Sequence, residues 1–243
     1  MKLPKIALAF AVLIVAGCET VTPSNPRGTV YQSSGPTEND IINLENKCYS
    51  GETYYCNALA NYYYVGAATP QNKSRAIDLW RKACNINVAE ACFNLGKAYL
   101  NREEGLRGNK TAIKLLTKAC DKRERRACTQ LGELHEKGKI VSRNRNKAYA
   151  YYSTACDMVD EKACHRLGLM QESRSSDRSG ILKAVVSYEK ACRFDIAESC
   201  LRAGNIYSTG KIVSKIPKVA SKFYDKGCNL GNKESCKKLG RLR

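Results

Sequence analysis

The cysteines of this chain recur with a fixed period. Twelve of its 13 cysteines form six pairs with the spacing C-x7-C, and each pair begins 36 residues after the one before it, as Cys84 does after Cys48. The pairs are Cys48 and Cys56, Cys84 and Cys92, Cys120 and Cys128, Cys156 and Cys164, Cys192 and Cys200, and Cys228 and Cys236. A gapless period of this length predicts a repeat protein, whose units each bury an apolar face against their neighbours.

The spacing inside a pair restricts the local structure. In one unbroken helix, two cysteines eight positions apart would have Cα atoms ~12 Å apart, because each residue adds ~1.5 Å. A disulfide needs a Cα separation of roughly 4.4 to 6.8 Å. Either the helix therefore breaks inside each pair, or the pair does not form a bridge.

Other residues repeat at the same period with helical spacing. Three residues after each second cysteine stand Leu59, Leu95, Leu131, Leu167, Ala203 and Leu239, followed at once by Ala60, Gly96, Gly132, Gly168, Gly204 and Gly240. A second series has alanine at 76, 112, 148, 184 and 220, with Trp80, Leu116, Tyr152, Tyr188 and Tyr224 four positions later. We expect helix A around each second cysteine and helix B ending at the next first cysteine, with the small residues of helix A allowing a neighbouring helix to approach closely.

Residues that favour turns separate these periodic segments. Gly, Ser, Asn and Pro interrupt the pattern at 66–70, 105–108, 138–142, 173–180 and 210–217. The pattern predicts an all-α fold of five helical hairpins, at about 53–84, 89–120, 125–156, 161–192 and 197–228. A half unit at 40–48 and a terminal helix from Lys233 would cap the two ends.

The first residues have the layout of an export signal. MKLPKIALAFAVLIVAGC begins with Lys2 and Lys5, continues with an apolar run of about ten residues and ends in small residues before Cys18. The ending V-A-G-C resembles a bacterial lipobox, and that resemblance implies cleavage before Cys18 and a diacylglycerol on its thiol. The expected organisation is a signal peptide at 1–17, a lipidated cysteine with a polar, flexible linker at 18–40, and a repeat domain at 41–243.

This start also predicts a location. Without Cys18, twelve cysteines remain, an even number that favours a disulfide framework in an oxidising compartment. Residue 19 is Glu, where enteric bacteria typically use Asp to retain a lipoprotein in the inner membrane. We therefore expect a lipid-anchored protein of the bacterial envelope, attached to the outer membrane and facing the periplasm.

The repeat itself carries a family resemblance. Residues 91–99 read A-C-F-N-L-G-K-A-Y, and this A-C-x-x-L-G-x-x-Y pattern resembles a Sel-one-like repeat, a relative of the tetratricopeptide repeat. With C-x7-C at every junction, residues 41–240 are similar to the Helicobacter cysteine-rich proteins. The resemblance implies a right-handed α-solenoid. His135 and Gln171 depart from the pattern, since other units have tyrosine there, which questions the packing of the third and fourth units.

Two disulfide pairings fit antiparallel hairpins. Cysteines could pair within a repeat, as Cys56 with Cys84, or locally within each C-x7-C motif. Pairing within repeats would leave Cys48 and Cys236 alone at opposite ends of the solenoid. We therefore expect the local pairing, with bridges that have a structural role.

The tetratricopeptide pattern also suggests a binding groove. In related solenoids helix A faces the concave side, and its outward positions lie two before and one, five and eight after each second cysteine. The expected groove residues are Tyr54, Asn57, Asn61, Tyr64, Phe93, Lys97, Thr129, His165 and Asn205. Aromatic and amide groups of this kind can anchor a peptide or a partner protein.

The positive charge is distributed unevenly. The net charge of the chain is +18. Fourteen-residue windows over the five B helices hold 17 Lys/Arg and 3 Asp/Glu, whereas windows over the five A helices hold 9 Lys/Arg and 6 Asp/Glu. We expect a basic convex face that could bind anionic lipid or an acidic envelope polymer. Nucleic acid is not an expected partner, because export separates the chain from it and no nucleic-acid motif occurs.

The function expected from these features is a non-catalytic interaction scaffold. Some members of the cysteine-rich family are described as penicillin-binding proteins or weak β-lactamases, and the chain contains the short patterns S-Y-E-K from Ser187 and S-T-G-K from Ser208. Neither pattern has the companion motifs of a serine β-lactamase. Redox or metal chemistry is not expected, since there is no C-x-x-C and only two histidines. A secreted or surface virulence or inhibitor protein is a further alternative.

Overall fold

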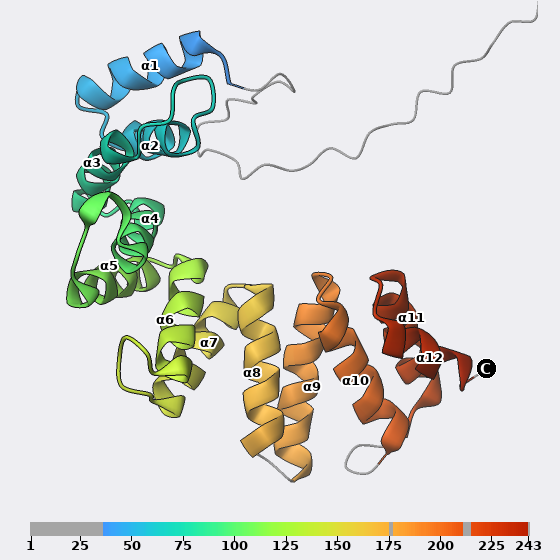
Figure 1. The fold of residues 1–243 in the computed structure, drawn as a ribbon. Coiled ribbons are helices and arrows are strands. Elements are labelled where there is room, and N and C mark those ends of the chain that lie inside the picture. The colour runs from blue at the N-terminus through green and yellow to red at the C-terminus, as the bar shows by residue number, and fades with distance from the viewer. Residues whose placement is uncertain (1–35, 175–176, 211–214, 243) are drawn as a thin grey trace, which may run out of the picture. The chain divides into compact units, whose positions relative to one another are not determined.

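The computed structural model describes residues 36–174, 177–210 and 215–242, and within them every regular element is helical (Figure 1). These helices belong to one compact unit, Thr37–Arg243. Their bounds are α1 Glu38–Tyr49, α2 Tyr55–Val65, α3 Lys73–Asn85, α4 Ala89–Asn101, the short 3-10 helix η1 Glu103–Gly105, α5 Asn109–Asp121, α6 Arg125–Lys137, α7 Arg145–Asp157, α8 Glu161–Arg174, α9 Arg178–Arg193, α10 Ala197–Thr209, α11 Pro217–Asn229 and α12 Lys233–Gly240.

The helices pack in chain order. Helix A of each repeat (α2, α4, α6, α8, α10) pairs with the helix B that follows it (α3, α5, α7, α9, α11), and each helix B packs on the next helix A. The terminal helices α1 and α12 pack on α2 and α11. The prediction of an all-α solenoid of five hairpins, bridged at every junction, is therefore confirmed. None of the described helices is long and apolar enough to cross a bilayer.

Two helix boundaries differ from the expected ones. The first helix begins at Glu38, before residue 40, because the side chains of Thr37 and Asp40 form a capping box that fixes the start. The fourth turn was expected to reach Gly180, but Gly180 lies buried in the first turn of α9. The side chain of Asp177 accepts a hydrogen bond from the Gly180 N–H, and this cap starts the helix three residues earlier than expected.

All six C-x7-C pairs form disulfides. Their Cα–Cα distances lie between 4.6 and 4.9 Å, so the helix does break inside each motif and the local pairing is confirmed. The break occurs three residues after the first cysteine, where the backbone takes a positive φ. At the six junctions, the residues in this conformation are Gly51, Asn87, Arg123, Val159, Asp195 and Gly231. Cys18 lies outside the described residues.

Close packing between hairpin partners depends on the repeated glycine of helix A. A Cβ added at Gly132, Gly168 or Gly204 would lie 2.6 to 2.7 Å from ring carbons of Tyr152, Tyr188 or Tyr224. These tyrosines are at most 1% exposed. The small residue therefore makes room for an aromatic ring of helix B, which brings the two helices together as expected.

The two departures from the tyrosine pattern are accommodated by local contacts. The ring of His135 stacks on Tyr151 with centroids 5.8 Å apart. The side chain of Gln171 accepts a hydrogen bond from the buried Ser187 hydroxyl. Hairpins α6/α7 and α8/α9 therefore keep the same helix pairing as the others.

Candidate interaction groove

A hollow of about 230 Å³ lies on the helix A side of the first two hairpins. Its wall comes from α2, α4 and the start of α6, with η1 at one end. We call this surface the N-terminal groove, defined by Asn61, Tyr64, Glu90, Asn94, Lys97, Glu103 and Arg126. It brings together the predicted groove residues Asn61, Tyr64 and Lys97.

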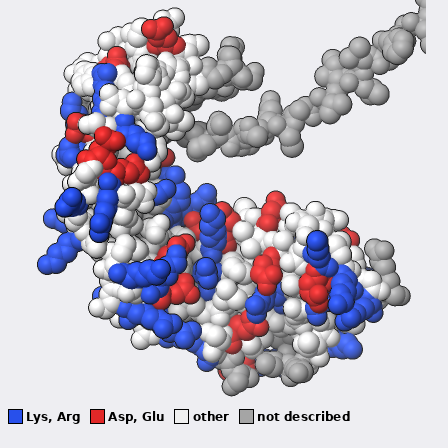
Figure 2. Space-filling model, viewed as in Figure 1, with Lys and Arg blue, Asp and Glu red and all other residues white. Residues whose placement is uncertain are grey.

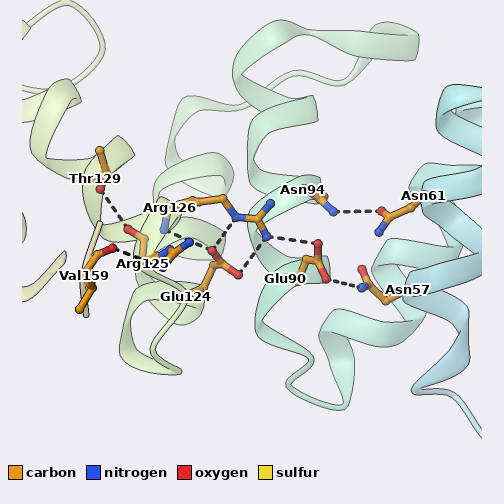
Figure 3. A network of polar contacts seen from close by, with 9 residues as sticks. All are labelled: Asn57, Asn61, Glu90, Asn94, Glu124, Arg125, Arg126, Thr129 and Val159. Atoms are coloured by element: carbon orange, nitrogen blue, oxygen red, sulfur yellow. Dashed lines mark hydrogen bonds and ion pairs between the residues drawn. The ribbon is translucent and has the colours of Figure 1, made fainter. Parts of the chain in front are cut away.

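A chain of polar contacts crosses three successive A helices in this groove (Figure 3). Asn57 of α2 donates from Nδ2 to Glu90 Oε2 of α4 at 2.9 Å, and Arg126 of α6 donates to Glu90 Oε1 at 3.2 Å. Arg126 is held in turn by Glu124, whose Oε1 lies 2.7 Å from its Nε. These acceptors raise the pKa of Arg126, so the guanidinium stays charged. The network fixes the spacing of the three helices along the groove.

A second set of contacts orients the amides and rings. Asn61 Oδ1 accepts a hydrogen bond from Trp80 Nε1 at 3.0 Å and another from Asn94 Nδ2 at 3.2 Å. The ring of Tyr64 packs against that of Trp80 with centroids 5.0 Å apart, and its hydroxyl donates to Glu103 Oε1 at 2.9 Å. Burial and this carboxylate raise the pKa of Tyr64, so it remains a neutral phenol.

Two acceptor atoms beside the groove have no hydrogen-bond partner. Asn57 Oδ1 and Glu103 Oε2 are both buried and unpaired, although the rest of each side chain is bonded. Such a group costs stability unless a donor reaches it. Because both atoms are buried, a donor from outside could reach them only after these side chains move.

Three predicted groove residues do not point outward. Asn57, Phe93 and Thr129 are only 8%, 6% and 7% exposed, so the prediction is wrong for the position after each second cysteine in these units. The next helix A covers this position, as when the Arg126 guanidinium lies 4.7 Å from the Phe93 ring centroid. Tyr54, in contrast, is half exposed and lies just before α2.

The last two predicted residues lie in the C-terminal hairpins and have internal partners. His165 Nδ1 lies 2.7 Å from Oγ of the buried Ser199. Burial, aided by Arg166, lowers the pKa of His165, so the ring is neutral near pH 7. Asn205 Oδ1 accepts a hydrogen bond from the Tyr224 hydroxyl at 3.0 Å. The structure therefore does not bring His165 or Asn205 into the N-terminal groove.

The tetratricopeptide mapping missed Asn94, Glu103 and Trp80 as parts of the groove. Asn94 stands two positions after a second cysteine, which the mapping did not include, and Glu103 lies in a turn. Trp80 was assigned to helix packing, and it is indeed buried, but its Nε1 holds Asn61 in place. The unusual Trp at a position filled by Leu or Tyr elsewhere was the one available signal.

The short serine motifs are not arranged around a base. The Ser187 hydroxyl is 5% exposed and donates to Gln171 Oε1 at 2.7 Å, while Lys190 pairs with Asp157. Ser208 Oγ donates to the Asn205 carbonyl and lies 2.8 Å from the Tyr224 hydroxyl. Lys211 of the second motif lies outside the described residues. In the described part of the chain, no cluster of three metal-ligating side chains occurs.

Comparisons with known proteins agree with this architecture. The family model for the Sel1 repeat matches residues 53–87, 89–123, 125–160 and 197–232. The unmatched residues 161–196 nevertheless form the hairpin α8/α9. No curated protein matches the sequence. Sel1 repeat proteins are protein-interaction scaffolds.

Several solved structures share the fold. A protective antigen of uropathogenic Escherichia coli with an SLR fold is 22% identical with a TM-score of 0.72, and the match covers 84% of this chain but only 44% of the antigen. A Sel1 repeat protein from Oxalobacter formigenes is 20% identical with a TM-score of 0.66, covering 83% of this chain and 89% of that one.

Helicobacter pylori cysteine rich protein B is 25% identical with a TM-score of 0.29, covering 70% of this chain and 96% of that one. Because the family model matches more than half of the sequence, in four separate copies, the chain belongs to the Sel1 repeat family.

Proposed function

We propose that this protein is a non-catalytic scaffold whose N-terminal groove binds an extended segment of a partner protein. The observation that carries the proposal is the hollow itself, which is lined by the amides of Asn61 and Asn94 and by Lys97, whose ammonium has no ion pair within the described residues. A peptide backbone supplies N–H donors at regular intervals. Asn94 Oδ1 can accept from such a donor and Asn61 Nδ2 can donate to a backbone carbonyl, whereas Asn61 Oδ1 already accepts from Trp80 and Asn94.

The groove also offers contacts for side chains of such a segment. Val65 at its edge is 69% exposed and provides apolar surface. The Lys97 ammonium lies 5.6 Å from the Phe93 ring centroid and has no ion pair within the described part of the chain. It is therefore free to meet an acidic or carbonyl group of the partner.

The proposed location is the bacterial envelope, with the chain tethered through lipid on Cys18 and facing the periplasm. Six disulfides favour an oxidising compartment, and the export-like start and the V-A-G-C ending favour lipidation. Mass spectrometry of the protein from a bacterial membrane tests this point, with Cys18→Ser as the control. A Cys18 thiol without diacylglycerol would contradict the tether.

The groove is tested by site-specific photocrosslinking from the native envelope. Photoreactive residues placed at Lys97 and at Val65 should capture the same partner protein. Lys114 is the matched control, because it is an exposed lysine on the next helix, α5, and lies outside the groove. Capture from Lys114 with equal yield, or from neither groove position, would overturn the proposal.

A nitrocefin assay on the same protein distinguishes the scaffold from an enzymatic alternative. Nitrocefin hydrolysis that persists after both Ser187→Ala and Ser208→Ala substitutions would point to contamination. Hydrolysis lost on one of these substitutions, with the fold intact by circular dichroism, would replace the scaffold by a β-lactamase-like function. The buried, amide-bonded Ser187 hydroxyl favours the scaffold.

A further inference from the structure

The outer surface of α9 differs from the corresponding surface of every other helix B. Leu182 and Val186, one helical turn apart, are 42% and 52% exposed. The equivalent positions in the other repeats are also exposed and hold no pair of large apolar residues. They are Ser74 and Asp78, Lys110 and Lys114, Asn146 and Ala150, and Lys218 and Lys222. One repeat therefore carries an apolar pair where the others are polar, small or basic.

A hollow lies beside this pair. It measures about 670 Å³ and is lined by α7, α8 and α9, with Leu167 contributing from α8. A volume of this size is within the range of roughly 300 to 1,000 Å³ that holds small ligands. It is wide enough to receive part of an acyl chain next to Leu182 and Val186.

Positive charge surrounds the apolar pair. Arg178 and Lys183 line the same hollow, and their side chains have no hydrogen bond or ion pair within the described residues. The nearby carboxylates are already engaged: Asp157 pairs with Lys190, and Asp177 caps α9. On the face drawn in Figure 2, basic side chains are spread along the row of helices with acidic ones among them. The α9 surface thus presents exposed apolar side chains next to cations that have no ion pair within the described residues.

We propose that the α9 face, formed by Leu182, Val186, Arg178 and Lys183, docks on an anionic phospholipid surface. Phosphate head groups would meet the two cations while the apolar pair enters the region of the acyl chains, as in peripheral proteins that combine both contacts. A polyanionic polymer would need the cations alone and would leave Leu182 and Val186 exposed. The proposal uses the envelope location proposed above but not the groove.

Vesicle binding tests the proposal with residues 37–243, the compact unit that contains all six bridges, so that no lipid anchor contributes. The protein should co-sediment with phosphatidylglycerol vesicles and not with phosphatidylcholine vesicles. Leu182→Ser together with Val186→Ser should lower the partition coefficient by at least about tenfold, since two exposed apolar side chains lose their buried area. The matched control, Asn146→Ser with Ala150→Ser at the equivalent positions of α7, should bind like the parent.

A fluorescence measurement gives an independent readout. The single tryptophan, Trp80, is 3% exposed, so its emission should stay constant when vesicles are added. The indole introduced by Val186→Trp should shift its emission to the blue on anionic vesicles and should be quenched by brominated acyl chains. The indole introduced by Ala150→Trp should show neither change. Absence of binding by the parent, or binding lost with Arg178→Ser and Lys183→Ser but unchanged by the apolar pair, would overturn the proposal. Either result leaves capture from Lys97 unaffected.

Discussion

The first two hairpins and the last three share their cysteine clamps but differ at one repeated position of helix B. Trp80 and Leu116 occupy it in α3 and α5, whereas Tyr152, Tyr188 and Tyr224 occupy it in α7, α9 and α11. Each tyrosine ring lies over a glycine of the preceding helix, and Leu116 lies over Gly96, whereas the first hairpin has Ala60 at the glycine position.

This difference determines how polar groups of helix A are used. The hydroxyls of Tyr152 and Tyr188 donate to Glu136 and Glu172 at 2.7 and 2.6 Å, within the same hairpin. Burial and these carboxylates raise the pKa values of both tyrosines. Both regions also bond across repeats, as Asn57 does with Glu90 and His165 with Ser199, but in the first hairpins the Tyr64 hydroxyl donates to Glu103 of the next repeat. The regions therefore differ in where these tyrosine hydroxyls bond: within one hairpin for Tyr152 and Tyr188, and between two repeats for Tyr64.

The largest expected effect tests whether the clamps are equivalent in the two regions. Replacing both cysteines of one bridge by alanine should lower the free energy of unfolding by about 2.5 kcal/mol, the chain-entropy value for a loop of about nine residues. Cys84/Cys92 and Cys192/Cys200 should give equal losses in urea unfolding. A difference above about 1 kcal/mol, larger than ordinary additivity errors, would show that the clamps themselves distinguish the regions.

The glycine contacts should distinguish the regions more directly. Gly168→Ala places a methyl group 2.6 Å from the buried Tyr188 ring and should destabilise by about 2 kcal/mol, the usual range for overpacking. Gly96→Ala meets the flexible Leu116 side chain at 3.0 Å, a milder contact, so the helix-propensity gain of about 1 kcal/mol that both variants share offsets most of its cost. Equal urea midpoints for the two variants would contradict the special role of the tyrosine ring.

Stability and binding should respond to different residues. Tyr188→Phe removes the hydrogen bond to Glu172 and should cost about 1 kcal/mol without changing partner capture from a probe at Val65. Lys97→Glu should change stability by less than about 0.5 kcal/mol, as expected for an exposed side chain, and should abolish that capture. The pair of variants sharpens the comparison, because the reverse result would assign binding to the C-terminal hairpins.

The α7/α8 junction, within the last three hairpins, contains a strained residue. Val159 has φ 62°, which is unfavourable for a β-branched side chain, whereas the equivalent positions at two other junctions are Asn87 and Asp195. Val159→Asn should stabilise the chain by about 1 kcal/mol in thermal or urea unfolding. Asn87→Val provides the matched reversal and should destabilise by a similar amount. No change in either variant would remove the junction as a source of difference.

The smallest effect is a pH dependence confined to the C-terminal hairpins. The pKa of His165 is lowered in the fold, so the unfolded chain binds more protons as the pH falls below about 6.5 and stability decreases with it. The Tm should therefore fall more between pH 7.5 and pH 5 in the parent than in His165→Gln. Identical pH profiles would show that burial of this ring does not contribute.

The sequence predicts the fold well because the same pattern of cysteines, small residues and apolar residues occurs in each repeat. The C-x7-C period, the glycines and the helix B series each specify one hairpin, and six copies remove the ambiguity of any single one. The groove is predicted less well, because burial of Asn57 or Phe93 depends on how closely successive A helices pack. Glu103 lies in a turn outside the period, where a repeat pattern carries no information. The lipidation of Cys18 stays a prediction.

The short reach of every bridge has a kinetic consequence. Each cysteine has its partner eight residues away, and a loop of about this length closes in roughly 10 to 100 ns, several-fold faster than the longer loops to any other cysteine. The local partner is thus the thiol that each cysteine meets most often, although the oxidation step itself takes seconds to hours depending on the oxidant. The native connectivity is then also the one favoured by these encounters, so the twelve cysteines can be oxidised with little need for later reshuffling.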